Sequence, residues 1–275
     1  MKKTAIKASE IHSFCRTVYS YFTRHKRRLP WRTDYDPYSI FISEIMLQQT
    51  QVDRVALKFG PFIAAFPDFQ SLAKAPLSRI YLHWQGLGYN RRALHCRQAA
   101  AIVMRDYGGT LPDSPETLVL LPGIGKATAA SICAFAFNKP VLFLETNIRT
   151  ALIHHFFPGR DSVSDEELLP IAQTVLDRKN PRRWYSALMD YGSMLKKEYG
   201  NASRRSSQYA KQPRFQGSRR QVRGAILKAL LARPGLTAVQ ISESIGVPPE
   251  TVRSVVALLV SEQLLTISKK RYRIP

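Results

Sequence analysis

Residues Leu121–Ala130 have the sequence LPGIGKATAA, and this stretch decides the fold that we expect for much of the chain. Gly123 and Gly125 bracket one apolar residue, which indicates a tight turn between two helices, because glycines let backbones approach closely. Lys126 then opens an alanine-rich helix. Backbone N–H groups at a helix start, together with a lysine, favour an anion. An ordinary corner between two helices is the alternative interpretation.

A lone carboxylate follows this turn. Leu144–Arg149 has the sequence LETNIR, in which Glu145 is the only acid in an apolar and basic run. An anion-binding turn followed by such an acid indicates chemistry on a nucleotide. The alternative is an acid that caps a helix.

The composition points to a globular protein with a polyanionic partner. The chain has 275 residues, of which 41 are Lys or Arg and 20 are Asp or Glu, giving a net charge of +21. Nucleic acid is the first candidate for the partner, and a ribosomal or membrane-surface role is the alternative. A hydrophobic content of 45% predicts a real core, and the length predicts about two domains.

Cysteine usage and the N-terminus indicate a reducing compartment. Cys15, Cys96 and Cys133 are scattered without a C-x-x-C spacing, so we expect buried free thiols and no metal site. The start MKKTAIK is followed by the polar ASEIHSFC, which lacks the apolar region of a signal peptide. We therefore expect a cytoplasmic, nucleoid-associated protein without a membrane partner.

Apolar periodicity predicts an all-α domain over residues 1–195, with almost no strand pattern. The expected helices are 8–25, 38–51, 51–66, 71–75, 76–84, 90–107, 114–120, 127–137, 146–156, 165–179 and 184–196.

Two segments carry further candidates for function. Glu44 lies inside the expected helix 38–51, where it is either solvent-facing or held in a pocket with a raised pKa. The neutral polar run Gln48, Gln49, Thr50 suits hydrogen bonding to bases. Tyr89 precedes Arg91 in the loop GLGYNRR, a pairing that favours stacking on nucleic acid, although a core tyrosine is the alternative.

The C-terminal part changes character twice. Residues 196–220 contain eight Lys or Arg and a single acid, which predicts a mobile basic linker or a phosphate-contacting segment. Residues 221–275 then predict helices 221–232, 238–245 and 249–263 and a hairpin around Lys269-Lys270, the pattern of a winged helix-turn-helix domain. The third helix carries more acid than base, so a docking or DNA-holding role fits as well as sequence reading.

Several long motifs, taken together, resemble one family. They are LPW (29–31), SEIMLQQTQV (43–52), GLGYNRRA (86–93), LPGIGKATA (121–129) and ALMDYGSM (187–194). Over 29–195 the chain resembles the helix-hairpin-helix (HhH-GPD) DNA glycosylases, and SEIMLQQTQV is most similar to the adenine glycosylases of the MutY type.

The resemblance implies a two-lobed fold that flips a nucleotide out of the duplex into a cleft between helical lobes and cleaves its N-glycosidic bond. Glu44 matches the acid that protonates the departing base, and Glu145 matches the position of the catalytic aspartate. Gln49 and Tyr89 match residues that wedge into the base stack. The helix-hairpin-helix, about 117–137, implies DNA-backbone contacts by Leu121, Gly123, Gly125, Lys126, Ala127 and Thr128.

One difference from the bifunctional relatives and three departures from the MutY pattern refine this expectation. Ala127 stands where bifunctional relatives such as endonuclease III have a lysine nucleophile, which predicts a monofunctional enzyme. Glu145 replaces an aspartate, and Thr146 replaces the usual glycine. The four-cysteine loop expected after Met194 is missing, so we expect no iron–sulfur cluster and no other cofactor. The resemblance does not extend to the domain that recognises 8-oxoguanine in this family, and we expect the winged helix in its place.

We therefore expect a monomeric base-excision enzyme acting on double-stranded DNA with a mispaired or damaged base, most simply adenine opposite guanine or 8-oxoguanine. Excision of thymine or uracil opposite guanine, or of a damaged purine, is the alternative within the enzyme class. A non-catalytic DNA-binding protein on a glycosylase fold is the contrasting reading, against which the retention of both Glu44 and Glu145 argues.

Overall fold

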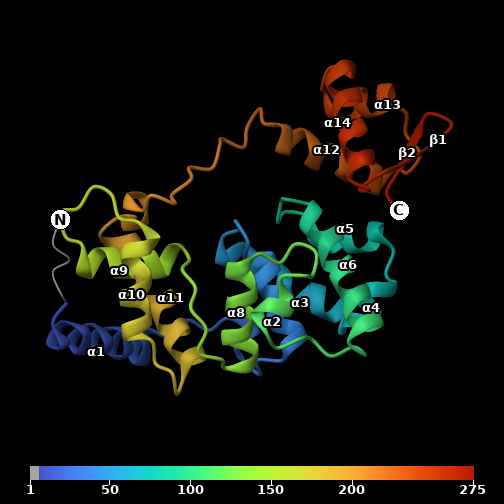
Figure 1. Ribbon diagram of the computed structural model, residues 1–275. Helices are drawn as coiled ribbons and strands as arrows, with labels where there is room; N and C mark the ends of the chain where they lie inside the picture. Colours follow the sequence, from blue (N-terminus) through green and yellow to red (C-terminus); the bar gives the residue numbers. More distant parts are fainter. Residues whose placement is uncertain (1–5) are drawn as a thin grey trace. The chain divides into compact units, whose positions relative to one another are not determined.

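The structure is a computed structural model that describes residues 6–275, so Met1–Ala5, on which part of the localisation expectation rested, lie outside the described residues (Figure 1). It is mostly helical, as predicted. The chain forms two compact units: the described chain up to Ile40 with 113–118 and 125–211, and 41–112 with 119–124 and 212–275. No described helix is long and apolar enough to cross a membrane.

The first unit is built around one long helix. Its elements are α1 (Ala8–His25), η1 (Pro30–Arg32), α7 (Pro115–Leu118), α8 (Lys126–Phe137), α9 (Thr146–Phe156), α10 (Asp165–Val175), α11 (Pro181–Glu198) and η2 (Ala202–Arg205). Helix α11 packs on α1, α8 and α9. The indole of Trp184, 1% exposed, meets the ring of Phe14 edge-on at 6.2 Å between centroids. Aromatic side chains of this size bury large apolar areas and contribute strongly to the core.

The second unit has a helical layer with its own aromatic core. Helix α2 (Pro37–Leu47) leads into it, followed by α3 (Val52–Ala65), α4 (Phe69–Lys74), α5 (Leu77–Trp84) and α6 (Arg91–Asp106). Trp84 is fully buried and lies 5.7 Å from Phe62, centroid to centroid. The predicted helix 38–51 ends earlier than expected, at Leu47, because Gln49 adopts a left-handed backbone with φ of 53°.

The C-terminal segment of this unit contains three helices and a hairpin in the predicted order. They are α12 (Arg219–Ala232), α13 (Ala238–Ile245), α14 (Pro249–Ser261), β1 (Thr266–Ser268) and β2 (Arg271–Arg273). The strands pair antiparallel, and Lys269 and Lys270 form the turn with φ of 48° and 60°. Tyr272 also donates its N–H to Leu236 O at 2.9 Å, which ties the hairpin to the loop before α13. The winged-helix assignment and the domain limits stay predictions.

The predicted linker 196–220 is wrong for its first part. Lys196 and Lys197 belong to the last turn of α11, and Ala202–Arg205 form η2. Ser203 and Ser206 are buried, and Arg205 donates to the carbonyl oxygens of Phe157 and Arg160 at 3.0 Å. The basic composition hid these contacts, because the arginine serves as a donor to the backbone rather than as a solvated charge.

Close packing of α9 on α11 depends on Gly192. A Cβ at this position would lie 2.1 Å from the carbonyl oxygen of Asn147. We predict that Gly192→Ala lowers the free energy of unfolding by at least about 1–3 kcal/mol, because backbone must move to relieve the overlap. Chemical denaturation measures this loss.

Gly224→Ala is the matched control. Gly224 lies inside α12, and nothing is within 4 Å of a Cβ built there. Alanine should therefore raise stability by roughly 0.5–1 kcal/mol through its better helix propensity. Equal effects of the two substitutions would contradict the assignment of Gly192 to a close helix contact.

Candidate functional site

The two glycines of the LPGIGKATAA turn differ in their surroundings. Gly123 has φ of 79°, and a Cβ there would lie 2.8 Å from the Cβ and Nδ1 atoms of His95 on α6. Its carbonyl oxygen accepts a hydrogen bond from Gln48 Nε2 at 3.0 Å. Gly125 is exposed, with nothing within 4 Å of a built Cβ. The first glycine thus serves packing, and the second leaves an approach open to a ligand.

Helix α8 begins at the open side of this turn. Gly125 is its N-cap residue, and the first intrahelical bond runs from Ala129 N–H to Gly125 O at 2.9 Å. Lys126 and Ala127 are exposed, and Thr128 is half-buried. The N–H groups in the first turn of a helix have no intrahelical acceptor, so this terminus carries the partial positive charge expected for an anion site.

The predicted wedge residues both have unusual backbones. Gln49 has φ of 53° and Tyr89 has φ of 47°, in the left-handed region that non-glycine residues seldom occupy. Gln49 is exposed and Tyr89 is half-buried. Such backbones persist only where the surrounding structure holds them, and they concentrate at functional positions.

Arg92 holds both of these loops. Its buried guanidinium donates from Nη1 to the carbonyl oxygens of Ile45, Met46 and Gln48 at 2.7–2.8 Å. Its Nη2 donates to Thr50 Oγ1 at 2.9 Å and to the carbonyl oxygens of Leu87 and Gly88 at 3.1 Å. Thr50 Oγ1 in turn donates to Leu87 O at 3.2 Å. One side chain therefore fixes the loop that carries Gln49 and the loop that carries Tyr89, and we call this arrangement the Arg92 clamp.

This clamp changes the interpretation of two predicted base contacts. The side chains of Gln48 and Thr50 make hydrogen bonds within the protein, as described above. Their contact with DNA stays a prediction. Within the protein, the Gln48 side chain holds the carbonyl of Gly123, and the Thr50 side chain joins its own loop to the loop that carries Tyr89. Arg92 was missed from the sequence, because its partners are backbone carbonyls on separate segments.

Tyr89 has further partners from the basic segment before α12. Arg220 Nη1 donates to the Tyr89 hydroxyl at 2.5 Å, and its guanidinium carbon lies 5.1 Å from the ring centroid. Gln212 Nε2 also donates to this hydroxyl. The Arg92 guanidinium lies 5.6 Å from the same ring. Two arginines thus contact the tyrosine from within the protein, and its stacking on nucleic acid stays a prediction. Arg91 is exposed and has no ion pair among the described residues.

The two candidate acids lie in different units and have different settings. Glu44 belongs to α2, where it is partly accessible between Ser43 and Ile45, which are fully buried. Glu145 is the N-cap of α9, and its Oε1 accepts from Asn147 N–H at 2.7 Å and from Ile148 N–H at 2.9 Å. The helix-cap interpretation of Glu145 is therefore correct in geometry.

The electrostatics of Glu145 are balanced between opposing effects. Burial raises the pKa of its carboxyl, while the two N–H donors and the positive charges of Arg149 and Arg27 act to lower it; the net pKa is raised. Arg149 is held in place by Asp165 at 2.7 Å. Both cap hydrogen bonds are accepted by Oε1, and the described residues show no hydrogen bond to Oε2.

Buried charges fix the segment ahead of η1. Asp190, with a side chain 1% exposed, accepts from Arg27 Nε at 2.6 Å and from Arg32 Nη1 at 3.0 Å. It also accepts from Arg27 N–H at 2.9 Å. Asp190 of the ALMDYGSM motif thus anchors the two arginines that flank LPW to α11, a connection between distant segments that local sequence patterns do not predict.

Cysteines and metal-binding side chains show no cluster in the described part of the chain. Cys96 and Cys133 are buried, Cys15 is half-buried, and all three are free thiols. No group of three or more His, Cys, Asp or Glu in residues 6–275 is arranged to hold a metal ion. The expectation of no iron–sulfur cluster stays a prediction.

The chain matches a family model that is described as "HhH-GPD superfamily base excision DNA repair protein" over residues 42–172. Residues 42–172 therefore carry the sequence pattern of the HhH-GPD superfamily. The matched stretch contains Glu44, the Arg92 clamp, the turn before α8 and Glu145. The prediction of the superfamily from the sequence motifs is confirmed.

Individual relatives agree with the family. The chain is 35% identical to an adenine DNA glycosylase of Buchnera aphidicola subsp. Baizongia pistaciae over 66% of its own length and 52% of the relative. It therefore spans about half the length of that protein. An adenine DNA glycosylase of Mycolicibacterium smegmatis is 29% identical over 88% of this chain and 89% of the relative.

A solved structure of a thermostable thymine-DNA glycosylase shares the fold. It superposes with a TM-score of 0.62 at 28% identity and covers 68% of this chain and 87% of that one. The all-α HhH-GPD fold that the sequence predicted is thereby confirmed for most of the chain.

The Arg92 clamp makes a direct prediction. Arg92→Lys keeps the charge but cannot donate to six oxygens, and it should lower the free energy of unfolding by about 2 kcal/mol or more, because buried carbonyls lose their donors. Denaturant unfolding measures the loss. Arg91→Lys, on the exposed neighbour, should stay within about 0.5 kcal/mol of the wild type. A similar small effect at both positions would remove Arg92 from its clamping role.

Proposed function

We propose that this protein is a monofunctional DNA glycosylase of base excision repair, which binds double-stranded DNA, flips out a mispaired base and hydrolyses its N-glycosidic bond. The observation that supports this most is the Arg92 clamp on the strained Gln49 and Tyr89 loops. Residues that fill the space left by a flipped base must already be held in place. Flexible loops would have to be ordered on binding, and this entropic cost would add to the free energy that unstacking the base requires.

The chemistry assigns separate roles to the two acids. Cleavage of the glycosidic bond develops negative charge on the base and positive charge on the sugar, as in sugar hydrolysis. Glu44 protonates the departing base, and Glu145 stabilises the sugar cation through its ionised carboxylate. General acid help of this kind is worth roughly 10²–10⁴-fold in rate.

The start of α8 supports the absence of a lyase step. Ala127 occupies the place of the family's lysine nucleophile, and Lys126 lies one residue earlier at the exposed helix terminus. Water is then the nucleophile, and the product is an abasic site. Gly125, Lys126 and Thr128 hold DNA phosphate, together with the other predicted backbone contacts in the turn.

The target base is the finer part of the proposal. The motif SEIMLQQTQV and the similarity to adenine DNA glycosylases favour adenine opposite guanine or 8-oxoguanine. The similarity to a thymine-DNA glycosylase structure favours thymine opposite guanine as the second candidate. The glutamate at position 145, in place of an aspartate, does not decide between these two target bases. We propose that the protein acts as a monomer, without a metal or cluster, in the cytoplasm.

Base release from a panel of duplexes tests the proposal. The panel contains A opposite G, A opposite 8-oxoguanine, and T or U opposite G, with alkali added to cut abasic sites. Strand cleavage only after alkali, with the adenine mispairs, is expected. Glu44→Gln should reduce single-turnover release by about 10²–10⁴-fold while duplex binding is retained. Cleavage without alkali, or full activity of Glu44→Gln, would contradict the mechanism.

The raised pKa of Glu145 predicts a pH dependence. The ionised carboxylate is the active form, and burial raises its pKa. On acidification, base release should therefore slow at a higher pH than it would with an ordinary glutamate, whose pKa is about 4.3. The single-turnover rate, measured from neutral to acidic pH, shows this decline. Glu145→Gln should be slow and show no such decline. A wild-type rate that stays constant down to the pH range in which an ordinary glutamate is protonated would contradict the role of Glu145.

A further inference from the structure

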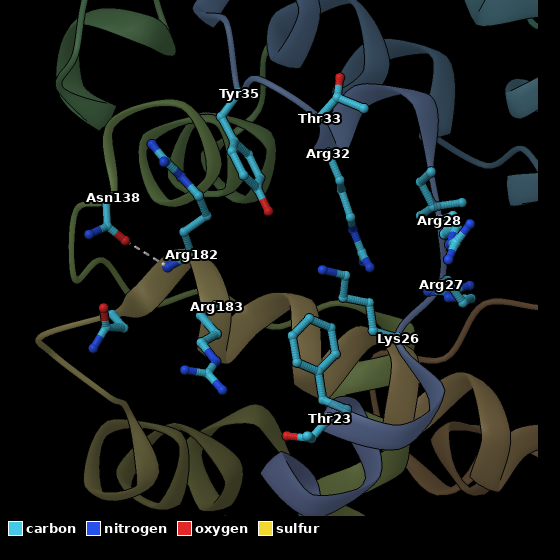
Figure 2. A pocket seen from close by; sticks show the side chains of 13 residues that line it. Thr23, Lys26, Arg27, Arg28, Arg32, Thr33, Tyr35, Asn138, Arg182 and Arg183 are labelled. Atoms are coloured by element: carbon cyan, nitrogen blue, oxygen red, sulfur yellow. Dashed lines mark hydrogen bonds between the residues drawn. The ribbon is translucent and has the colours of Figure 1, made fainter.

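A second concentration of positive charge lies in the first unit, apart from the turn before α8. A pocket of about 770 Å³ is lined by residues from the end of α1, the LPW segment, the end of α8 and the start of α11 (Figure 2). Its lining includes six cations, namely Lys26, Arg27, Arg28, Arg32, Arg182 and Arg183.

The pocket is distinct from the proposed DNA contact at the α8 N-terminus. Asn138, the C-cap residue of α8, lines the pocket, whereas Lys126 begins the same helix. A helix of 12 residues at 1.5 Å rise per residue separates these ends by about 18 Å. A phosphate held at Lys126 therefore does not reach into the pocket.

The positive charge in the pocket exceeds the nearby negative charge. Asp190 is the ion-pair partner of both Arg27 and Arg32. Asp177, near Arg183, already accepts from the Tyr19 hydroxyl at 2.6 Å. Asp34 and Asp36 are close in sequence but do not line the pocket, and each accepts a local backbone N–H.

Lys26, Arg28 and Arg182 have no carboxylate partner among the described residues. Lys26 and Arg28 are exposed. Arg182 donates to the carbonyl oxygens of Phe135 and Ala136 at 2.6 and 2.7 Å, which orients the guanidinium without neutralising it. Like charges gathered in one concave space are unfavourable by themselves, and an anion bound there would be stabilised by all of them.

Tyr35 forms part of the wall of the pocket. Its ring lies under the Arg182 guanidinium, whose carbon is 4.4 Å from the ring centroid. Its hydroxyl faces the space between Arg182 and Arg32, as Figure 2 shows. The backbone of Tyr35 is left-handed, with φ of 56°. A strained, bulky residue that presents a hydroxyl donor to a cationic space is a feature of a binding site rather than of a plain surface.

The volume of the pocket limits which ligands can use all of its charges. A single phosphate can contact only some of the six cations that line the pocket, while a volume of about 770 Å³ lies in the range of small-molecule sites. Guanidinium and ammonium groups bind phosphate oxygens through short charge-assisted hydrogen bonds. We propose that this pocket binds a ligand with a chain of two or more phosphate groups, supplied by a nucleoside triphosphate or by inorganic polyphosphate.

Calorimetric titration of the full-length protein with tripolyphosphate and with ATP, in the absence of DNA, tests the site separately from base release. Both probes should bind, and binding should weaken as salt is added. Lys26→Gln/Arg28→Gln removes two exposed charges without disturbing a described hydrogen bond. It should weaken binding by at least about tenfold, as expected for the loss of one charge-assisted hydrogen bond.

Lys196→Gln/Lys197→Gln is the control, because it removes the same charge from the last turn of α11, the helix whose first turn lines the pocket. It should leave both affinities nearly unchanged. Equal affinity for the two probes would show that the phosphate chain alone is recognised, and tighter binding of ATP would identify a nucleotide; both support the site. No binding, an equal loss in the two double variants, or displacement of ATP by undamaged duplex would overturn the proposal.

Discussion

The second unit depends on one buried positive charge that has no carboxylate partner. The Arg92 guanidinium is surrounded by carbonyl oxygens from the end of α2 and from the loop before α6, and its removal from water lowers its pKa to about 10. It therefore remains charged at neutral pH. A carbonyl carries only a partial charge, so several are needed to offset the cost of burial. That requirement draws both loops to one point and fixes the backbones of Gln49 and Tyr89.

The same principle of fixed geometry applies to Glu145 in the first unit. Its carboxylate begins α9, so the helix terminus that it caps also orients it. The contact of Gly192 with the backbone of Asn147 sets α9 against α11. On a flexible loop, a glutamate would be held less firmly than an aspartate, because its side chain is one methylene longer. The hydrogen bonds of the helix cap hold the longer side chain of Glu145 in one orientation. A structural and a catalytic role are thus compatible in one side chain.

Local patterns in the sequence were sufficient for most of the fold. The predicted limits of α1, α9 and α13 agree with the structure, because apolar periodicity and capping residues are local signals. The end of α2 was misplaced, since the left-handed Gln49 is imposed by the distant Arg92. The segment after Met194 was misjudged because composition cannot distinguish a solvated arginine from one that donates to buried carbonyls. The charged pocket was equally invisible, as its cations come from separate stretches that only the fold brings together.

The division of the chain into two units has a consequence for how the protein is made. The second unit is assembled from 41–112, 119–124 and 212–275, and the N–H of Ser78 on α5 donates to the carbonyl oxygen of Pro275 at 3.1 Å. Residues 125–211 of the first unit are synthesised between these partners. A ribosome-bound chain thus exposes the face of α5 until the last helices emerge, and contacts of such long sequence separation form slowly. The order of synthesis, rather than the stability of either unit, then sets when the second unit can form all of its contacts.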